Sequence, residues 1–466
     1  MRPVFHFTPP ANWMNDPNGL VFFDGEWHLF YQHNPYADTW GHMHWGHAVS
    51  QDLLHWTHLP IALHEDLVRE AMIFSGSAAV DWHNTSHLGN RDQPPLIAAY
   101  TEHTKHEQAQ CLAYSTDRGR TWTPFAENPV IAIGAREFRD PKLFWHTSTQ
   151  RWVMACALPD QHKVRFYASA DLRHWQWLSD FGPAGAVQGV WECPDLFPLT
   201  LDDGSGQQRW VLKVDDTQFG AQYFVGHFDG EVFLCDDPPT RVRQIDCGAD
   251  FYAAQSWNDA PNRRHVWLAW MNNWAYAQRT PTTPWRGMMT APRELALQRR
   301  DGEIYLVQRP IAELAHLRGA GLRCINAGFE QVNRQLSELC GVALELDLRL
   351  KCAENAQVFL SIRRGAAEET IVGYRADQAQ LCIDRTRSGN VAFAPQFDGL
   401  HTAICPLREG ELHLHVLIDL HSVELFADGG RVILSDLVFP TSPEATLSLE
   451  TQGLVSVTAL NAWRLG

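Results

Sequence analysis

Three acidic residues, Asp16, Asp140 and Glu192, each stand just before a short apolar run. We call these positions anchors. Ser75 and Asp250 occupy comparable positions before apolar runs, so the five anchors recur at intervals of 52 to 65 residues. Carboxyl groups brought together this way suit glycoside hydrolysis, in which one attacks the anomeric carbon and another protonates the leaving oxygen. A third carboxylate can hold sugar hydroxyls and stabilise the positive charge of the transition state.

Aromatic residues accompany these acids in the sequence. The chain has 19 Trp, 23 Phe and 10 Tyr, and we expect most of them to pack blades and sheets, as at Trp56, Trp122 and Trp175. A smaller group lies close to the acidic anchors and could form walls for sugar rings. This group comprises Trp13, Trp40, Trp45, Phe74, Trp191 and Trp274.

The elements that would position these side chains are short β-strands in an internal repeat. Five repeats of about 50–65 residues, each with several strands, are typical of propeller blades. The first strand of each blade lines the central axis, so polar residues at one end of these strands would converge on a funnel. Polar residues at strand starts are also common turn formers. However, Asp140 and Glu192 occupy the same position within their repeats, which favours a shared functional site. We expect third strands at Leu96–Tyr100, Trp152–Ala157, Trp210–Val214 and Val266–Trp270.

The pattern changes near residue 300. Residues 308–314 look like a short helical linker, and clean alternation of apolar and polar residues follows, as in Val342–Leu350. The sequence therefore predicts an all-β chain in which a five-bladed β-propeller is followed by a C-terminal β-sandwich. The expected domains are a catalytic propeller over residues 1–305, a linker over 306–320 and the sandwich over 321–466.

Composition restricts the partners. The chain has 38 Lys and Arg against 54 Asp and Glu, a formal net charge of −16, and no basic block. We therefore expect no nucleic-acid partner and no membrane partner. The spacing of His42, His44 and His47 along a strand suggests packing, so we expect no metal and no cofactor. The ten Cys include no C-x-x-C pair and the first residues lack an apolar signal core, so we expect free thiols in a reducing cytoplasm. Secretion by another route stays open.

Four motifs then resemble those of a known family. They are Trp13-Met14-Asn15-Asp16-Pro17-Asn18-Gly19, Phe74-Ser75-Gly76-Ser77, Phe138-Arg139-Asp140-Pro141 and Trp191-Glu192-Cys193-Pro194-Asp195. In order and approximate spacing they are similar to the motifs of glycoside hydrolase family 32, which contains invertases, exo-inulinases and levanases. The resemblance spans nearly the whole chain and implies the same propeller and sandwich.

The resemblance also implies roles for individual residues. Asp16 matches the nucleophile, Glu192 the acid/base and Asp140 the transition-state stabiliser of a retaining, double-displacement β-fructosidase. Such an enzyme is exo-acting and releases terminal non-reducing β-D-fructofuranosyl residues. Other residues match positions that bind the substrate. These are Trp13, Asn15, Gln32, Trp40, Phe74, Ser75, Arg139, Tyr252 and Trp274.

The preferred substrate and the assembly stay open at this point. Residues 40–50, 250–255 and 270–274 look closer to exo-inulinases and levanases than to plant or yeast invertases. A cytoplasmic enzyme would instead meet sucrose and short fructo-oligosaccharides, with inulin and levan as further candidates. A fructosyltransferase could use the same carboxylates with a sugar acceptor, and a catalytically inactive sugar-binding propeller is the more remote alternative. A homodimer formed through the sandwich also stays open.

Overall fold

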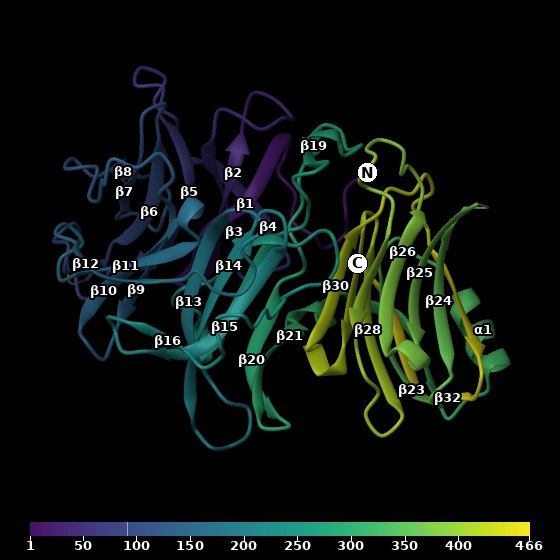
Figure 1. The fold of residues 1–466 in the computed structure, drawn as a ribbon. Coiled ribbons are helices and arrows are strands. Elements are labelled where there is room, and N and C mark those ends of the chain that lie inside the picture. Colours follow the sequence, from purple (N-terminus) through teal and green to yellow (C-terminus); the bar gives the residue numbers. More distant parts are fainter. Residues whose placement is uncertain (91, 366) are drawn as a thin grey trace.

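The computed structural model describes residues 1–90, 92–365 and 367–466, and nearly all of its regular elements are β-strands. Figure 1 shows two bodies side by side, one formed by the strands up to Pro310 and one by the strands from Arg318 onward. The chain is therefore all-β, as the short apolar runs predict.

Residues 12–310 form five sheets, each built, apart from the short strand β19, from antiparallel strands taken in chain order. The first strand of each sheet carries one of the repeated anchors or lies directly beside it. In chain order the sheets are β1 (Asn12–Phe23), β2 (Glu26–Asn34), β3 (His44–Ser50) and β4 (Trp56–Leu63); β5 (Met72–Val80), β6 (Leu96–His103), β7 (Gln108–Ser115) and β8 (Thr123–Pro124); β9 (Arg139–His146), β10 (Arg151–Leu158), β11 (Lys163–Ser169) and β12 (Gln176–Phe181); β13 (Trp191–Thr200), β14 (Gln208–Asp216), β15 (Gly220–Phe228) and β16 (Phe233–Cys235); and β17 (Tyr252–Ser256), β18 (Val266–Trp270), β20 (Arg293–Arg300) and β21 (Glu303–Pro310).

The five first strands contact one another in a closed cycle. β1 contacts β5, β5 contacts β9, β9 contacts β13, β13 contacts β17, and β17 contacts β1 again. A two-residue strand, β19 (Trp285–Arg286), also joins the first sheet as a parallel partner of β1. Late segments of this body therefore complete its first sheet.

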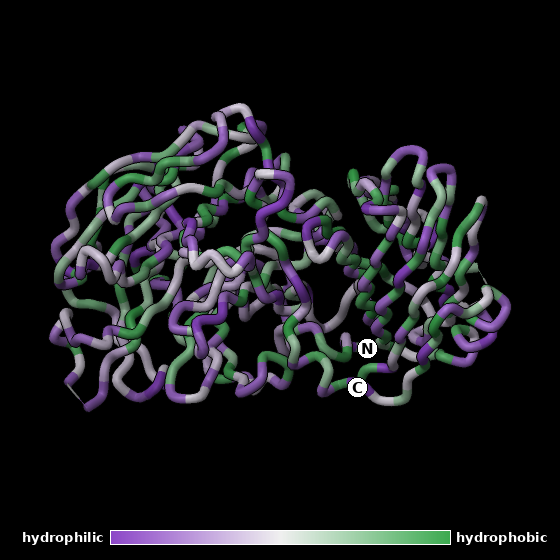
Figure 2. The backbone as a smooth tube through the Cα atoms, turned by 90° about the horizontal axis from the view of Figure 1, so that it is seen from below, coloured by the Kyte–Doolittle hydropathy of each residue, from purple (hydrophilic) through white to green (hydrophobic). Residues whose placement is uncertain are grey.

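Residues 318–465 form two facing sheets of six and five strands. Their inner faces enclose one apolar core, which includes Leu346, Leu360 and Val416, and Figure 2 shows hydrophobic and hydrophilic residues alternating along these strands. This pattern is that of a β-sandwich. The first sheet has the order β22 (Arg318–Ile325), β32 (Val455–Leu465), β23 (Leu344–Cys352), β28 (Glu411–Asp419), β29 (Ser422–Ala427) and β30 (Val432–Leu437), and the second has the order β27 (Leu400–Ile404), β26 (Gln380–Arg387), β25 (Glu368–Arg375), β24 (Gln357–Arg364) and β31 (Thr446–Gln452).

Helices are scarce. Within residues 1–90, 92–365 and 367–466, the only α-helix is α1 (Phe329–Glu338), which lies against β31. No helix in these ranges is long and apolar enough to cross a membrane. Short 3-10 turns make up the rest, at Pro159–Gln161, Pro261–Arg263, Ala277–Arg279, Ala312–Leu317, Ala376–Gln378 and Asp428–Gly430.

Two details of the sequence prediction need correction. The segments expected as third strands, such as Leu96–Tyr100, lie in β6, β10, β14 and β18, which are the second strands of their sheets. The error arises because each of the first four anchors forms a single strand with the apolar run after it, and the run after Asp250 is likewise one strand, β17. The expected linker helix begins later than residue 308, because β21 continues to Pro310 and the 3-10 turn starts at Ala312.

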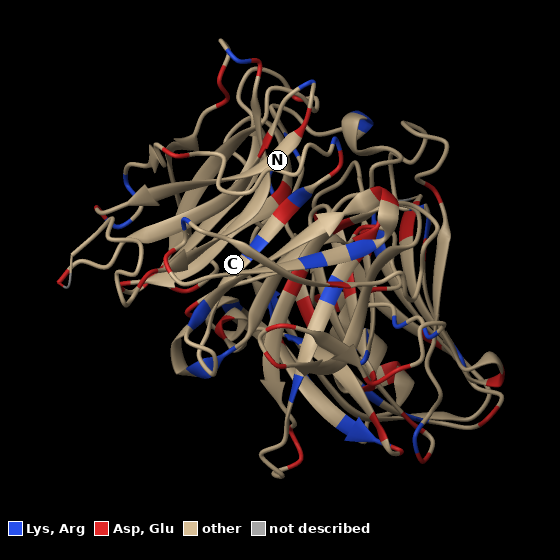
Figure 3. Cartoon of the chain, turned by 60° about the vertical axis from the view of Figure 1, so that its left-hand side comes forward, with Lys and Arg blue, Asp and Glu red and all other residues tan. Residues whose placement is uncertain are grey.

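Buried ion pairs join the two bodies. Arg293 of β20 pairs with Glu424 of β29 at 2.6 Å, and Arg385 of β26 pairs with Asp250, before β17, at 2.5 Å. His6 lies between Asp419 and Glu424, at 2.8 and 2.9 Å. Elsewhere, acidic and basic residues are interspersed rather than separated by sign (Figure 3).

The pKa of His6, which lies at this junction, is raised. Burial alone would lower the pKa of His6, but its hydrogen bonds to Asp419 and Glu424 and their negative charges raise that pKa to about 9. The same junction brings the chain ends together. The Val4 amide donates to Asp419, the Gly466 amide donates to Leu317, and both termini lie at this junction (Figures 1 and 2).

Candidate active site

Each of the five first strands carries an irregularity at the same place in the repeat. The pairing register with the second strand shifts between Met14 and Pro17, Phe74 and Gly76, Arg139 and Lys142, Glu192 and Asp195, and Tyr252 and Gln255. Such β-bulges bend a strand and redirect its side chains, and they are common beside active sites.

The residue types at these bulges fit the irregular backbone. Pro141 and Pro194 lie within two of the shifts, and Pro17 ends a third. Proline has no backbone N–H to donate, so it is tolerated where strand pairing is interrupted. Asp140 and Cys193 adopt left-handed backbone angles, with φ of 62° and 50°, which a regular strand does not allow. The proline residues and the residues with left-handed backbone angles therefore bend these strands and do not end them.

The redirected side chains meet in one pocket of about 320 Å³. The pocket contains all three predicted carboxylates together with most of the predicted binding residues. Its lining consists of Asn15, Asp16, Gln32, Trp40, Phe74, Ser75, His103, Gln108, Glu137, Arg139, Asp140, Glu192 and Trp274.

Asp16 is buried and held on both carboxylate oxygens. The Asn15 amide donates to Oδ1 at 3.0 Å, and the Ser75 hydroxyl donates to Oδ2 at 2.6 Å. The Cys193 thiol also reaches Oδ2, at 3.6 Å. Burial, together with the nearby charge of Glu192, raises the pKa of Asp16, while the hydrogen bonds from Ser75 and Asn15 act against that rise. The carboxylate is thus fixed in orientation.

Asp140 lies beside Arg139 at the third anchor. Its Oδ2 accepts a hydrogen bond from the Cys193 amide at 2.8 Å, and its own amide donates to Thr101. Burial raises the pKa of Asp140 to about 7; the Arg139 charge opposes this shift, and the charges of Glu192 and Asp16 add to it. Crowding of like charges in the pocket therefore acts on both aspartates.

Glu192 is less buried than the aspartates, and each of its two carboxylate oxygens accepts a hydrogen bond. Arg139 donates to its Oε1 from Nη2 at 2.8 Å and from Nε at 3.2 Å. The Tyr252 hydroxyl donates to the other oxygen, Oε2. The remaining Nη1 of Arg139 donates to Glu137 and to Gln108. Although burial acts against it, the charges of Glu192, Asp140 and Glu137 raise the pKa of Arg139.

Aromatic rings form two walls of the pocket. On one side the Phe74 ring stacks on His103, with centroids 4.3 Å apart, and meets Trp40 edge to face. On the other side Trp274 stacks on Trp13, with centroids 6.1 Å apart, and packs against Trp270. Trp40 and Trp274 remain more than a third exposed, at 39% and 37%. Their exposed faces are free to meet a sugar ring.

Two predicted binding residues lie behind the pocket instead of lining it. Trp13 is fully buried and donates from its indole to Asn15 at 2.7 Å, and buried Tyr252 contacts Glu192. Trp45 and Trp191 are also fully buried, so they pack the interior. These four residues support the pocket from the layer beneath it.

The prediction missed three lining residues: His103, Gln108 and Glu137. His103 ends β6 and Gln108 begins β7, so they flank a hairpin at the same end of the sheet as the anchors. Glu137 precedes Arg139 by two residues. The antiparallel course of the strands was the signal that could have placed His103 and Gln108 here.

The arrangement offers a fixed carboxylate (Asp16), a second carboxylate held by Arg139 and Tyr252 (Glu192), and a third (Asp140) whose Oδ2 lies 3.9 Å from Arg139 Nε. In the part of the chain that the structure describes, no group of three or more His, Cys, Asp or Glu is arranged to hold a metal ion. The chemistry available from these side chains is nucleophilic attack and proton transfer within an aromatic pocket.

Comparison with known proteins also indicates a glycosyl hydrolase. The model of the glycosyl hydrolases family 32 N-terminal domain matches residues 6–310, and that of the family 32 C-terminal domain matches residues 313–464. A levanase of Bacillus subtilis (strain 168) is 43% identical over 462 residues, which covers 96% of this chain and 68% of that protein. An extracellular exo-inulinase of Aspergillus awamori is 37% identical over 502 residues, covering 97% of this chain and 92% of that protein.

A solved structure is similar over the whole chain. The β-fructofuranosidase of Schwanniomyces occidentalis, complexed with fructosyl-erythritol, matches with a TM-score of 0.88 and 27% identity, covering 100% of this chain and 97% of that one. Since the two family models together account for nearly every residue, this chain belongs to glycosyl hydrolases family 32.

Proposed function

We propose that this protein is an exo-acting, retaining β-fructosidase that hydrolyses terminal β-D-fructofuranosyl residues from sucrose and fructans. The observation that carries the proposal is the single pocket shared by Asp16, Asp140 and Glu192. The proposal is supported by the relatives, which are named levanase, exo-inulinase and β-fructofuranosidase.

In the first half of the reaction, Asp16 is the nucleophile and Glu192 the acid. The Asp16 carboxylate attacks C2 of the fructosyl unit while Glu192 gives its proton to the departing oxygen, so one C–O bond forms as another breaks. The Ser75 and Asn15 hydrogen bonds hold Asp16 in the attacking orientation. This route predicts a separation of about 5–5.5 Å between the carboxyl groups of Asp16 and Glu192.

In the second half, Glu192 takes a proton from water, and the resulting hydroxide displaces Asp16 from C2. Two inversions leave the configuration of the released fructose unchanged. Asp140 binds fructose hydroxyls and stabilises the developing positive charge, since it lines the same pocket as both other carboxylates. Arg139 orients Glu192 through its two donors.

The pocket walls would hold the fructosyl ring. Asn15, Gln32 and Ser75 supply polar groups, and Trp40, Phe74 and Trp274 supply apolar surface. Trp13 and Tyr252 would act from behind this lining, through Asn15 and Glu192 respectively. A pocket rather than an open groove suits attack on a chain end, which agrees with exo-acting cleavage.

The closed cycle of first strands supports a five-bladed propeller for the N-terminal body, with the pocket at one end of its axis. The expected division into residues 1–305, 306–320 and 321–466 stays a proposal. We place its first boundary after Pro310, because β21 pairs with β20 along its whole length up to that residue.

Location and assembly are also proposals. All ten cysteines are free thiols, which suits the reducing cytoplasm expected from the sequence, although a relative is named extracellular. A homodimer through the sandwich would be detected by light scattering of the purified chain.

The decisive experiment is product chromatography after incubation with sucrose, 1-kestose, inulin and levan in parallel. We expect free fructose from the first time points and retention of the β-configuration by NMR. Oligofructans in excess of fructose at all sucrose concentrations would assign a fructosyltransferase instead. Binding of these sugars without any turnover would assign an inactive sugar-binding protein.

A further inference from the structure

A buried arginine of the sandwich contacts two segments of the other body that lead into the active site. Arg385 of β26 is fully buried. Its Nη1 donates to Asp250 Oδ2 at 2.5 Å, its Nη2 donates to the Tyr276 hydroxyl at 3.0 Å, and its Nε donates to the Phe397 carbonyl at 2.7 Å. The fork of the guanidinium thus joins three segments that are distant in sequence.

The two partners outside the sandwich each lie two residues from a residue of the site. Asp250 precedes Tyr252, whose hydroxyl contacts the Glu192 carboxylate. Tyr276 follows Trp274, which lines the pocket. Any shift of Asp250 or Tyr276 would therefore be passed on to a side chain of the site through a single intervening residue.

The two segments are also tied to each other. Tyr276 donates from its hydroxyl to Asp250 Oδ1 at 2.5 Å, and Asn273 donates from its side chain to the Ala249 carbonyl at 2.9 Å. Asp250 further accepts the Leu437 amide of β30 at 2.8 Å. The two segments and the sandwich therefore form one hydrogen-bonded unit.

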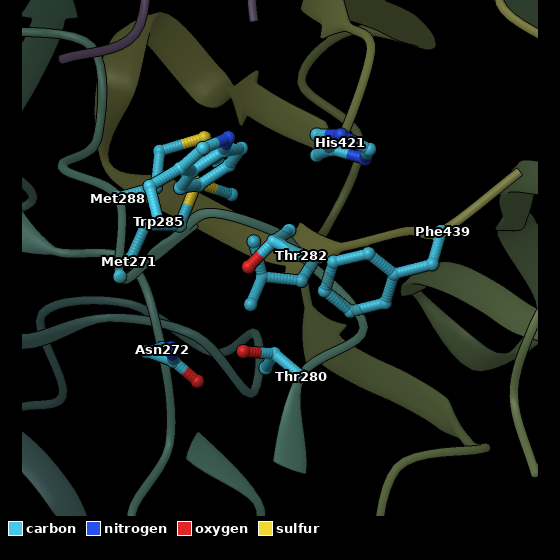
Figure 4. Close-up of a pocket in the computed structure, with 10 residues that line it drawn as sticks. Met271, Asn272, Thr280, Thr282, Trp285, Met288, His421 and Phe439 are labelled. Atoms are coloured by element: carbon cyan, nitrogen blue, oxygen red, sulfur yellow. The ribbon is translucent and has the colours of Figure 1, made fainter. Parts of the chain in front are cut away.

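The sandwich also supports the Trp274 segment by packing. The Tyr276 ring meets Phe397 edge to face, with centroids 5.2 Å apart, and the Arg385 guanidinium lies 4.0 Å above the Phe397 ring. Figure 4 shows the next part of the same loop, where Thr282, Trp285 and Met288 surround a small cavity closed by His421 and Phe439 of the sandwich. The segment that follows Trp274 thus contacts the sandwich at Tyr276 and again around this cavity.

We propose that Arg385 is a positioning residue for catalysis, through which the sandwich fixes Tyr252 against Glu192 and Trp274 against the substrate. This inference rests on the proposed fructosidase function for its kinetic consequences. It assigns the sandwich a part in the reaction, because Arg385 reaches the acid/base through Asp250 and Tyr252.

A matched control exists within the sandwich. Arg364 of β24 is also buried; its Nη2 donates to the Val342 carbonyl at 3.1 Å and to the Asp419 carbonyl at 2.8 Å, and its Nη1 donates to the Pro443 carbonyl. All three partners lie in the sandwich, and none adjoins a residue of the pocket. Arg385→Lys and Arg364→Lys both keep a positive charge and lose the guanidinium fork, so both should lower the melting temperature.

The two variants should differ in catalysis. Arg385→Lys should lower kcat/KM for sucrose by about 10²-fold, the cost of a misplacement near 1 Å, whereas Arg364→Lys should stay within about twofold of wild type. The loss should divide between a higher KM, from Trp274, and a lower kcat, from Tyr252 and Glu192. With β-fructosyl fluoride, whose leaving group needs no proton, the fall in kcat should be much smaller. Equal kcat/KM values for the two variants would overturn the proposal.

A second variant and a second readout keep the test decisive. Tyr276→Phe removes one hydroxyl from the unit and should lower kcat/KM by about tenfold even if Arg385→Lys fails to fold. Hydrogen–deuterium exchange should quicken in residues 249–256 and 271–279 in the Arg385 and Tyr276 variants but not in Arg364→Lys. Unchanged exchange there would refute the positioning role even if the wild type hydrolysed no fructoside, a result that would separately refute the proposed function.

Discussion

The stability of this protein should fall steeply in mild acid because of a histidine buried between the first two sheets. His28 of β2 is fully buried, and its Nδ1 lies 3.1 Å from Nε2 of His47. Burial, reinforced by the charges of Arg120 and Arg118, lowers the pKa of His28 to about 3. The native protein therefore holds this ring neutral at pH values where an exposed histidine is charged.

The sign of the effect follows from proton uptake. In the unfolded chain His28 would titrate near pH 6.5, so below that pH the unfolded state binds a proton that the native state refuses. Stability is fully present above pH 6.5 and is lost as the pH falls toward 3. With 1.36 kcal/mol per unit, the shift amounts to roughly 5 kcal/mol in all and about 2 kcal/mol between pH 6.5 and 5.

The test replaces this ring with a side chain that does not titrate. His28→Gln should cost about 1–2 kcal/mol at pH 7, because it loses packing against Phe30 and His47. The variant and the wild type should then have equal free energies of unfolding near pH 5, where the wild type has lost about 2 kcal/mol. Urea unfolding followed by tryptophan fluorescence at pH 7, 6 and 5 would measure the difference at each pH.

The control is Leu360→Ala, which removes packing from the core of the sandwich and no titratable group. Its free-energy difference from the wild type should be the same at each pH. If the free-energy difference between His28→Gln and the wild type were the same at pH 7 and pH 5, the assignment of a neutral buried ring would be wrong.

Four further results are expected. Asp16→Asn and Glu192→Gln should each lower kcat by about 10²–10⁴-fold or more, and product assays showing unchanged hydrolysis would remove these roles. Ser75→Ala removes a hydrogen bond that lowers the pKa of Asp16, so the acid limb of the kcat/KM profile should move to higher pH. His6 has a raised pKa, so its stabilisation should be complete below pH 6.5 and lost as the pH rises through 9; His6→Gln should then destabilise the protein at pH 6 but hardly at pH 10, as thermal melts would show. Treatment with EDTA should leave the activity unchanged, and a loss restored by a divalent cation would refute a metal-free mechanism.

The repeat in the sequence was enough to bring the acidic anchors together. Asp16, Asp140 and Glu192 share a phase, and equivalent strand ends in a cyclic arrangement must face the same space. Ser75 shares that phase and indeed donates to Asp16. Periodicity therefore predicted the composition of the pocket floor, since each anchor lies on the strand nearest the centre.

The sequence pattern could not predict which way the side chains at the bulges point. A strand period of two cannot say whether Trp13 or Tyr252 points into the pocket, because the register shifts after each of them. Glu137 was also missed, since its place beside Arg139 depends on the loop before β9. Contacts such as Arg385 with Asp250 join residues 135 apart in the chain, and no local signal marks them.

The closure of the first sheet by β19 has a consequence for biosynthesis. β1 carries Asp16, yet its partners include Trp285 and Arg286 of β19 and the segment at Asn258. The residues before β1 are held by Asp419 of β28 in the sandwich. During synthesis, Asp16 therefore emerges before the segments that complete its sheet and hold the residues ahead of it. The pocket cannot form until those later segments have been made, because closing so long a loop needs both of its ends.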